Sequence, residues 1–346
     1  MKFVRTLLFA SLLIGMVGCG PSISTPAIET LQVNLEGEEI ALGAPQIALM
    51  LARGGLGDKA FNDNANEGLE RAADELGVLV ATFDYQPDTQ EGNIRKIASY
   101  GYNLIIALGS ENAAAITAVA ADFPNTKFAI IDANAEGPNI TSVTFSELEG
   151  DFLAGALAAL LAEDGKIGYL GGADVLVIRR IQFGFEQGVK YVNPDAEIVV
   201  EYIGGVDDFS GFAKPEEGKR IASEMYANGV NVIYGAAGGS TLGAIEAAEA
   251  ASGLIITTGS DQRYIAPQVV VTSRTKNMDK AVYTMIESFM NGTLKGGSIQ
   301  LDYASGGIGL ASLSTDLVPE SVSTRFEQIR ADLEAGKIVV TPFEVN

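Results

Sequence analysis

The segment VNVIYGAAGGSTLGAIEAA, residues 230–248, decides the fold class of this 346-residue chain. A short aliphatic run, Val230–Tyr234, leads into a glycine-rich turn, and a helical pattern then begins at Leu242. A strand that passes through glycines directly into a helix is half of a parallel βα unit. No lysine follows the glycines, so the turn does not match the GxxxxGK[ST] phosphate loop, which disfavours a nucleoside triphosphatase.

The same alternation of strand and helix patterns extends along the chain in both directions. Mostly apolar runs predict strands at Gln46–Leu51, Val78–Phe83, Leu104–Leu108, Phe128–Asp132, Ser142–Phe145, Lys166–Leu170, Glu197–Ile203, Val230–Tyr234, Leu254–Thr258 and Val269–Thr272. Amphipathic patterns predict helices at Asn64–Leu76, Glu91–Tyr100, Ala113–Ala121, Val177–Tyr191, Glu216–Ala227 and Leu242–Ala251. Apolar strands that alternate with helices predict an α/β fold whose parallel sheets are covered on both faces. The stretch Phe152–Ala162 is apolar all round but too short to span a bilayer, so it predicts a buried helix.

The number of strands fits two doubly wound, Rossmann-like lobes better than one. We place the first break between Asp132 and Phe145 and a return crossing near residues 255–275. The expected N-terminal lobe is residues 45–135 plus about 255–280, and the expected C-terminal lobe is residues 136–254 plus about 281–346. Glycines at the ends of several strands predict that a ligand crevice lies between the lobes.

The chain begins with features of an export signal. Lys2 and Arg5 precede an apolar run, Leu7–Val17, that is too short for a permanent membrane helix, so residues 1–18 are predicted to be a signal peptide. The sequence Met16-Val17-Gly18-Cys19 resembles the lipobox of bacterial lipoproteins, with Met16 where leucine is usual. That resemblance implies lipidation of Cys19; ordinary secretion is the alternative. The polar residues 19–44 have the composition of a tether.

Composition removes several classes of function. The chain has no histidine and a single cysteine, which excludes Ser-His-Asp triads and disfavours zinc sites. We therefore expect no metal and no cofactor. After loss of the leader, 21 basic residues face 44 acidic ones, a formal net charge of −23. Such a chain is not expected to bind nucleic acid or anionic lipid headgroups.

Several motifs along the chain resemble one known family. They are GLGDKAFNDNANEGLERAADELGV (55–78), FPNTKFAIID (123–132), EGDFLAGALAALL (149–161), KIGYLGGADVLVIRRIQFGFEQGVKYVNPD (166–195), NVIYGAAGGSTLGAIEAA (231–248) and SDQ (260–262). In this order they are similar to the basic membrane protein family, solute-binding lipoproteins of bacterial ABC importers that include purine nucleoside receptors. The resemblance implies a type I periplasmic-binding-protein fold, in which two Rossmann-like lobes with parallel sheets are joined by a hinge.

The resemblance also implies a set of ligand-binding residues. Phe61 and Asn62 match a Phe-Asn pair whose ring stacks on the nucleobase and whose amide binds the edge of the base. Asp132 matches a ligand-contacting aspartate, and Lys276 matches a lysine near the sugar. Each also has a plainer explanation: Phe61 as a core residue, Asp132 as a cap of the next loop, and Lys276 as a surface lysine.

Further implied contacts come from the expected C-terminal lobe. They are the glycine pair Gly238 and Gly239 and a second stacking ring supplied by Phe209 or Phe212. Asp261, in the segment expected in the N-terminal lobe, is also an implied contact. The sequence alone does not choose between the two rings.

Two positions depart from the family pattern. Ala52 and Gly259 stand where the family places acids that contact the ligand, which weakens the inference of a nucleoside. Arg53, Ser260 or Asp261 could compensate.

The expected function is capture of a nucleoside-like small molecule, with a purine as the base, in the cleft between the lobes. The expected partners are an ABC permease and a separate ATPase subunit, and the expected location is the extracytoplasmic side of the cell membrane through the lipid on Cys19. No catalysis is expected. The alternatives are a nucleoside or sugar hydrolase that uses carboxylates such as Asp132 and Asp261, and a ligand-sensing surface lipoprotein without an importer.

Overall fold

The computed structural model describes residues 32–33, 39–40, 43–162 and 165–344. Residues Met1–Leu42 and Gly43–Asn346 are two separate units. In the first unit, strands β1 (Gln32–Val33) and β2 (Glu39–Ile40) pair antiparallel, a short pairing that the composition of the predicted tether does not indicate. The predicted signal peptide and Cys19 lie outside the described residues.

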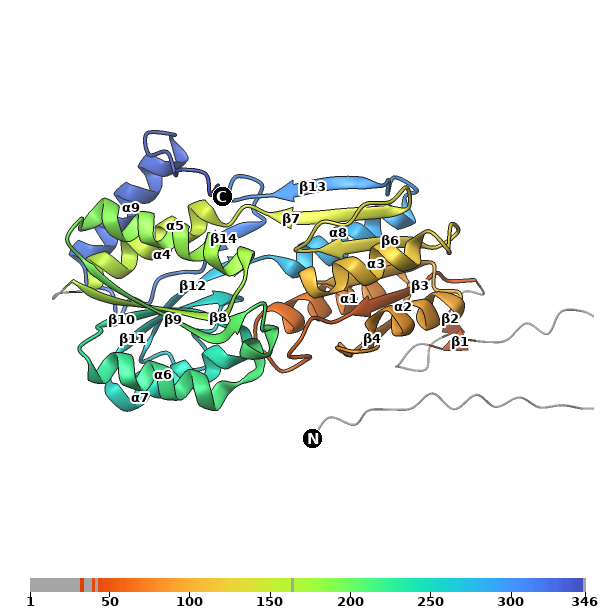
Figure 1. Cartoon of the computed structure of the whole chain (residues 1–346). Coiled ribbons are helices and arrows are strands. Elements are labelled where there is room, and N and C mark those ends of the chain that lie inside the picture. Colours follow the sequence, from red (N-terminus) through yellow and green to blue (C-terminus); the bar gives the residue numbers. More distant parts are fainter. Residues whose placement is uncertain (1–31, 34–38, 41–42, 163–164, 345–346) are drawn as a thin grey trace, which may run out of the picture. The chain divides into compact units, whose positions relative to one another are not determined.

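Within the described part of the second unit, twelve strands form two six-stranded sheets (Figure 1). The sheet of the N-terminal lobe has the order β13-β7-β6-β5-β3-β4 and is parallel throughout. Its strands are β3 (Gln46–Met50), β4 (Leu79–Phe83), β5 (Leu104–Leu108), β6 (Lys127–Ile131), β7 (Ile140–Phe145) and β13 (Gly297–Leu301).

The sheet of the C-terminal lobe repeats the same pattern, with the order β14-β12-β11-β10-β8-β9. Its strands are β8 (Lys166–Asp174), β9 (Glu197–Val206), β10 (Val232–Ala236), β11 (Leu254–Gly259), β12 (Val270–Lys276) and β14 (Ile308–Leu310). Five of these strands are parallel, and β14 runs antiparallel to β12. The expectation of two Rossmann-like sheets is confirmed.

Helices cover both faces of each sheet, which explains why the strands are apolar on both sides. In the N-terminal lobe, α1 (Phe61–Leu76) and α8 (Met278–Met290) pack on one face, and α2 (Gln90–Ser99) and α3 (Ala113–Ala120) pack on the other. In the C-terminal lobe, one face carries α4 (Leu148–Leu161), α5 (Leu176–Val192) and α9 (Glu320–Glu334), and the other carries α6 (Pro215–Ala227) and α7 (Thr241–Ala251).

The helix α4 is buried along nearly its whole length, as its apolar sequence predicts. It crosses α5 at glycines, where the two backbones approach closely. A Cβ atom at Gly155 would lie 2.0 Å from the carbonyl oxygen of Phe185, and one at Gly188 would lie 1.9 Å from that of Phe152. Neither glycine could carry a side chain without separating the helices, so this crossing is locked by backbone packing.

The expected lobe boundaries are wrong in three places. Strand β7 belongs to the N-terminal sheet, and β11 and β12 both belong to the C-terminal sheet. Helix α8 and strand β13, expected mostly or wholly in the C-terminal lobe, belong to the N-terminal lobe. The first two errors have one physical cause. Parallel neighbours are usually joined through a helix, but β6 joins β7, and β11 joins β12, through a loop alone. Because the sequence pattern shows no helix between these neighbouring strands, it wrongly indicated a lobe boundary between them.

The chain passes between the two sheets three times: from β7 to α4, from β12 to α8, and from β13 to β14. Neither lobe is therefore a continuous segment. The expected lobe bounds also require three passages, but the structure places them at other residues.

Candidate functional site

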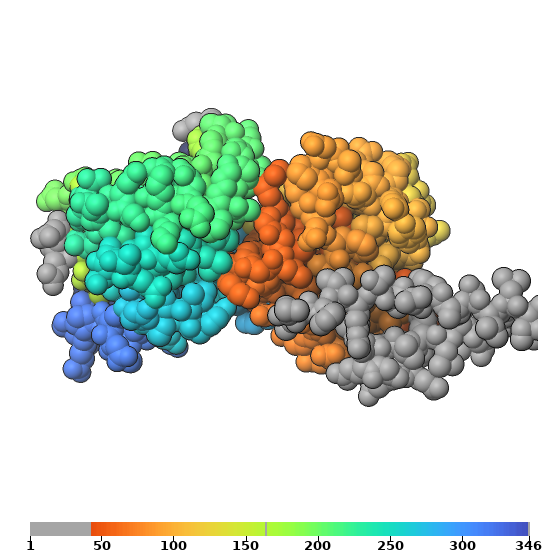
Figure 2. Space-filling view, turned by 90° about the horizontal axis from the view of Figure 1, so that it is seen from below, coloured from red at the N-terminus to blue at the C-terminus, as the bar shows by residue number. Residues whose placement is uncertain are grey.

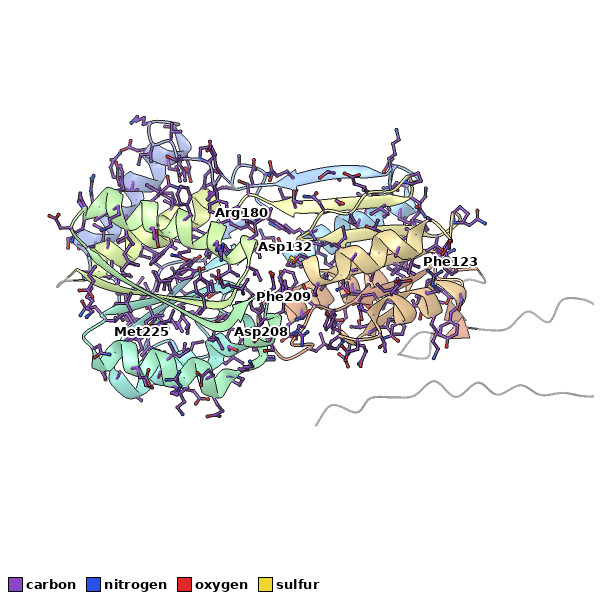
Figure 3. The ribbon with its side chains drawn as sticks, viewed as in Figure 1. Phe123, Asp132, Arg180, Asp208, Phe209 and Met225 are labelled. Atoms are coloured by element: carbon purple, nitrogen blue, oxygen red, sulfur yellow. The ribbon has the colours of Figure 1, made fainter. Side chains whose placement is uncertain are left out.

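A pocket lies where the carboxyl ends of strands from both sheets meet. Its lining comes from the segments that follow β3, β5, β6, β8, β9 and β10, and from the last residues of β10, β11 and β12. It contains about 820 Å³ of empty space, part of it open to solvent. Figure 3 shows Asp132 and Phe209 at this junction, whereas Phe123 lies at the opposite end of the N-terminal lobe.

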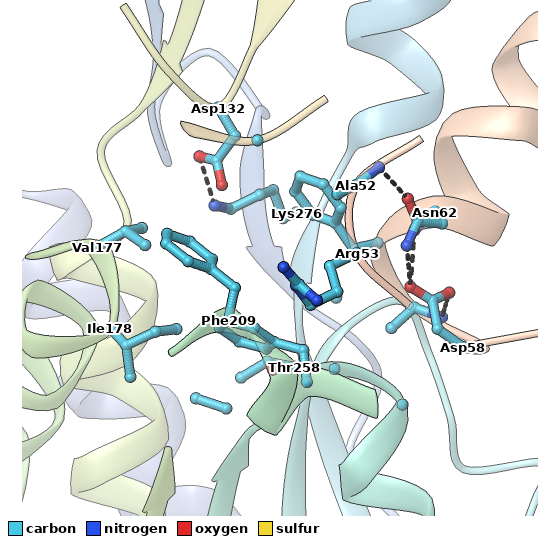
Figure 4. Close-up of a pocket in the computed structure, with 18 of the residues that line it drawn as sticks. Ala52, Arg53, Asp58, Asn62, Asp132, Val177, Ile178, Phe209, Thr258 and Lys276 are labelled. Atoms are coloured by element: carbon cyan, nitrogen blue, oxygen red, sulfur yellow. Dashed lines mark hydrogen bonds and ion pairs between the residues drawn. The ribbon is translucent and has the colours of Figure 1, made fainter. Parts of the chain in front are cut away.

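The loop between β3 and α1 is held by Asp58. Its carboxylate accepts hydrogen bonds from the backbone N–H groups of Ala60 and Asn62 at 3.0 and 2.9 Å, and so satisfies donors that a helix N-terminus leaves unpaired. The Asn62 amide donates to Asp58 at 3.1 Å, and its oxygen accepts from the N–H of Ala52 at 2.9 Å. Both partners are visible in Figure 4. Asn62 lines the pocket, but its amide already ties the loop to the helix.

Three phenylalanines line the pocket: Phe61 at the start of α1, and Phe209 and Phe212 in the short 3₁₀ helix Phe209–Ala213 that follows β9. The ring of Phe209 extends toward Val177 and Asp132 (Figure 4). The ring of Phe212 lies against the backbone of β8, since a Cβ atom at Gly172 would be 2.3 Å from its Cδ1. Phe212 therefore occupies the space beside Gly172, whereas the ring of Phe209 is the better placed of the two to contact a ligand in the pocket.

Lys276, at the end of β12, joins both lobes electrostatically. Its Nζ lies 2.8 Å from Asp132 Oδ1 and 2.7 Å from Glu147 Oε1. Arg180 of α5 binds the other oxygen of Glu147 at 2.7 Å. Burial acts to raise the pKa of Glu147, but Lys276 and Arg180 outweigh it and hold that pKa at about 2. Asp132 itself follows β6 with φ of 67°, a left-handed conformation that is uncommon outside glycine.

A second buried ion pair lies behind the first, within the C-terminal lobe. Arg274 Nε lies 2.8 Å from Asp151 Oδ1, and the hydroxyl of Tyr234 donates to the same oxygen at 2.5 Å. Burial raises the pKa of Asp151 to about 6 although Arg274 opposes the rise. Arg274 also lines the pocket. Its position within an apolar strand gave no indication of this from sequence.

Of the residues predicted to bind a ligand, Phe61, Asn62, Asp132, Phe209, Phe212, Gly238, Gly239 and Lys276 come together at this pocket. Asp261 does not line it, contrary to expectation. Its carboxylate turns back to accept from the N–H of Arg263 at 3.1 Å and is half exposed. At Gly259, φ is +106° and a Cβ atom would lie 2.8 Å from that of Ala60, so the backbone there leaves no room for an acidic side chain.

Two further charged residues line the pocket: Glu111, which was not predicted as a site residue, and Arg53, which was named only as a possible substitute for the missing acids. They meet where the ends of β3 and β5 adjoin, and Glu111 Oε1 accepts from the backbone N–H of Arg53 at 3.0 Å. Burial raises the pKa of Glu111. The sequence signal for Glu111 was its place just after Gly109, at the end of a predicted strand.

The loop after β3 also contacts the C-terminal lobe. The backbone carbonyl of Lys59 accepts from Ser260 Oγ at 2.6 Å and from Gln262 Nε2 at 2.9 Å. Figure 2 shows this red-orange part of the chain lying against the teal surface of the C-terminal lobe. These bonds join the lobes beside the pocket.

Among the described residues, no group of three or more His, Cys, Asp and Glu side chains is arranged to hold a metal ion. No helix among these residues combines the length and apolarity needed to cross a membrane.

Known proteins resemble this chain in sequence and in fold. Basic membrane protein A of Borreliella afzelii is 31% identical, covering 87% of this chain and 92% of that protein. A CD4+ T-cell-stimulating antigen of Listeria monocytogenes is 30% identical, covering 85% of this chain and 87% of that protein. A solved ABC transporter solute-binding protein of Aeropyrum pernix K1 shares 28% identity with a TM-score of 0.79, covering 87% of this chain and 94% of its own.

The family match spans nearly the whole second unit. The family model for PnrA-like ABC transporter substrate-binding proteins covers residues 46–338, which include both sheets and every lining residue of the pocket. With relatives of about 30% identity over most of the chain, the assignment rests on sequence and fold together. The chain belongs to the Bmp family of ABC transporter substrate-binding proteins.

Proposed function

We propose that this protein captures a purine nucleoside in the pocket between its lobes, outside the cytoplasmic membrane, and delivers it to an ABC permease. Family membership implies a small solute and a partner permease with its ATPase. The observation that carries the choice of a nucleoside is the pairing of an aromatic ring from each lobe, Phe61 and Phe209, at one pocket. A flat base held between such rings gains about 1–3 kcal/mol from stacking on each ring.

Polar groups of the same pocket suit a sugar. Asp132 keeps its carboxylate at the pocket wall while Lys276 neutralises it at 2.8 Å, and charged acceptors and donors make the stronger hydrogen bonds. Gly238 and Gly239 let the backbone approach a ligand closely. A bound solute would contact both lobes and stabilise the closed arrangement by its differential affinity, together with the bonds that Lys59 makes to Ser260 and Gln262.

Capture is proposed without catalysis. The carboxylate pair considered for a hydrolase, Asp132 and Asp261, is not brought together, because Asp261 lies outside the pocket. Incubation of the purified protein with inosine or adenosine, followed by chromatography for free base, tests this directly. Release of base in stoichiometric excess over protein would replace the proposal with the hydrolase.

The nucleoside is tested by calorimetry and thermal unfolding with a panel of inosine, guanosine, adenosine, uridine, cytidine and ribose. A ligand at a hundred times its Kd stabilises the folded state by about 2.7 kcal/mol, so a purine nucleoside should raise the Tm by several degrees. The matched control is Phe61→Ala, in which the shift should be lost. Absence of both heat and shift for every nucleoside would refute the ligand and leave the family assignment intact.

The anchor is proposed from the resemblance around Cys19. Detergent phase partitioning of the expressed protein should place the wild type in the detergent phase and Cys19→Ala in the aqueous phase. Equal partitioning of the two proteins would favour ordinary secretion.

A further inference from the structure

Arg53 is a pocket-lining cation without an ionic partner among the residues that the structure describes. Its Nε is buried and makes no hydrogen bond there, and no carboxylate oxygen of the described chain lies within 4.0 Å of its guanidinium. Its guanidinium carbon lies 5.1 Å from the ring of Tyr85, and the guanidinium attracts the carboxylate of Glu111 without forming an ion pair with it. Figure 4 shows the side chain reaching from the loop after β3 toward the middle of the pocket.

The other lining cations differ from Arg53 in having carboxylate partners, although Nη1 of Arg274 is also buried without a hydrogen bond among the described residues. Lys276 is bound by Asp132 and Glu147, and Arg274 is bound by Asp151. A buried polar nitrogen without a partner costs free energy, about 1–3 kcal/mol. A bound solute that accepts hydrogen bonds from Arg53 would recover that cost.

Arginine constrains the solute because it only donates. Its planar guanidinium offers adjacent N–H groups in a fixed fork and has no acceptor, so it selects an edge that carries two acceptors. The backbone that carries the fork is fixed, since Glu111 binds the N–H of Arg53 at 3.0 Å. A purine with an oxygen at C6 presents O6 and N7, two acceptors, on one edge. Adenine presents N7 beside an amino donor on that edge and cannot accept from both arms.

An oxyanion would also offer two acceptors, but two features favour a neutral edge. Asp58, Glu111 and Asp132 line the pocket with Arg53, Lys276 and Arg274, so acids balance bases there. The whole chain carries a formal net charge of −21, which repels anionic solutes at a distance.

Resting on the proposed nucleoside function, we propose that Arg53 is a specificity-determining residue that binds O6 and N7 of the base and selects 6-oxopurine nucleosides over adenosine. The preference follows from the fork itself, so it requires guanidinium geometry and not positive charge alone.

The test is calorimetric measurement of Kd for inosine, guanosine, 7-deazaguanosine, adenosine and inosine monophosphate. The proteins are the wild type, Arg53→Met, Arg53→Lys and the control Arg220→Met, an exposed arginine of α6 outside the pocket. The wild type should bind inosine about 10- to 100-fold more tightly than adenosine. The ratio of inosine affinity to adenosine affinity should fall to near one in Arg53→Met and stay at the wild-type value in Arg220→Met. In Arg53→Lys it should lie between these two values.

Changing the ligand instead of the protein gives the more specific test. 7-Deazaguanosine lacks the N7 acceptor, so it should bind the wild type more weakly than guanosine but bind Arg53→Met equally well. Equal wild-type affinities for inosine and adenosine, or a preference that persists in Arg53→Met, would overturn the inference and leave the nucleoside function standing. Tighter binding of inosine monophosphate than of inosine would also overturn it, in favour of an oxyanion site. If no nucleoside binds, the proposed function fails and the inference fails with it.

Discussion

The two ends of the pocket differ in how their charges are satisfied. At the end formed by the crossovers between the lobes, Lys276, Asp132, Glu147 and Arg180 satisfy one another. At the end formed by the loop after β3, the guanidinium of Arg53 has no ionic partner among the described residues. A buried charge that is fully paired holds the structure together, whereas one without a partner is available to a solute. The contrast separates residues that build the site from residues that choose its ligand.

The largest expected effect comes from removing Lys276, the cation that pairs with both Asp132 and Glu147. Lys276→Met leaves Asp132 and Glu147 without their ammonium partner, and breaking one side of a buried pair costs about 3–5 kcal/mol. Urea unfolding of the variant measures the loss. Lys59→Met is the matched control, because Lys59 is half exposed and its pair with Asp63 is 3.6 Å long; it should cost less than about 1 kcal/mol. Similar losses in the two variants would remove the distinction.

The next largest effect is a pH dependence at Glu147. Its pKa in the folded protein is about 2, below the ordinary 4.5, so its ionised form stabilises the fold fully above pH 4.5. That contribution is lost as the pH falls through about 2. At neutral pH it amounts to roughly 3 kcal/mol. The difference in unfolding free energy between the wild type and Glu147→Gln should therefore be constant from pH 8 to 5 and shrink from pH 4.5 downward. A difference that grows toward acid pH would contradict the assignment.

An intermediate effect is expected on ligand binding when one of the phenylalanine rings that line the pocket is removed. Phe209→Ala should weaken the proposed purine nucleoside by about 1–3 kcal/mol, the contribution of one stacking ring. Calorimetry measures the Kd, with Tyr264→Ala as control, since Tyr264 is an aromatic residue that is 68% exposed and does not line the pocket. Unchanged affinity in Phe209→Ala would transfer the stacking role to Phe212.

The smallest expected effect is on the stability of Arg53→Met. Because Arg53 has no carboxylate partner among the described residues and its Nε is buried without a hydrogen bond there, its loss should lower the unfolding free energy by no more than about 0.5 kcal/mol, since removing the unpaired nitrogen is favourable. Arg180→Met is the matched arginine; it removes charged hydrogen bonds to buried Glu147 and should cost about 1.5–3 kcal/mol. Thermal and urea unfolding of both variants without ligand makes the comparison. A large loss in Arg53→Met would mean that the guanidinium has a structural role.

The sequence predicted those features that depend on local pattern. Apolar runs and helical periods located most of the strands and helices, because each sheet is covered on both faces and its strands are apolar throughout. The lobe boundaries were misplaced because the short loop Asp132–Asn139 joins parallel neighbours without a helix. Helices α8 and α9 were not predicted, and α8 packs on α1, which lies about two hundred residues earlier.

The residues of the pocket could also be predicted only where they depend on local sequence pattern. Residues at the ends of predicted strands, such as Asp132 and Gly238, could be found from position and from family resemblance. Arg274 could not, because its partner Asp151 lies on another element and only the folded chain brings them together. The lack of an ionic partner for Arg53 among the described residues could not be predicted from sequence either, because it depends on which carboxylates the fold places beyond ion-pair distance.

The three passages between the lobes also govern the order in which the chain can fold during synthesis. The sheet of the N-terminal lobe begins with β3 but lacks its edge strand until Gly297–Leu301 has been made. The parallel core of the C-terminal lobe, β8 to β12, is complete at Lys276. At about 5–20 residues per second, a ribosome needs roughly eight to thirty seconds to pass from β7 to its neighbour β13. The lobe that emerges first is therefore finished after the core of the lobe that follows it.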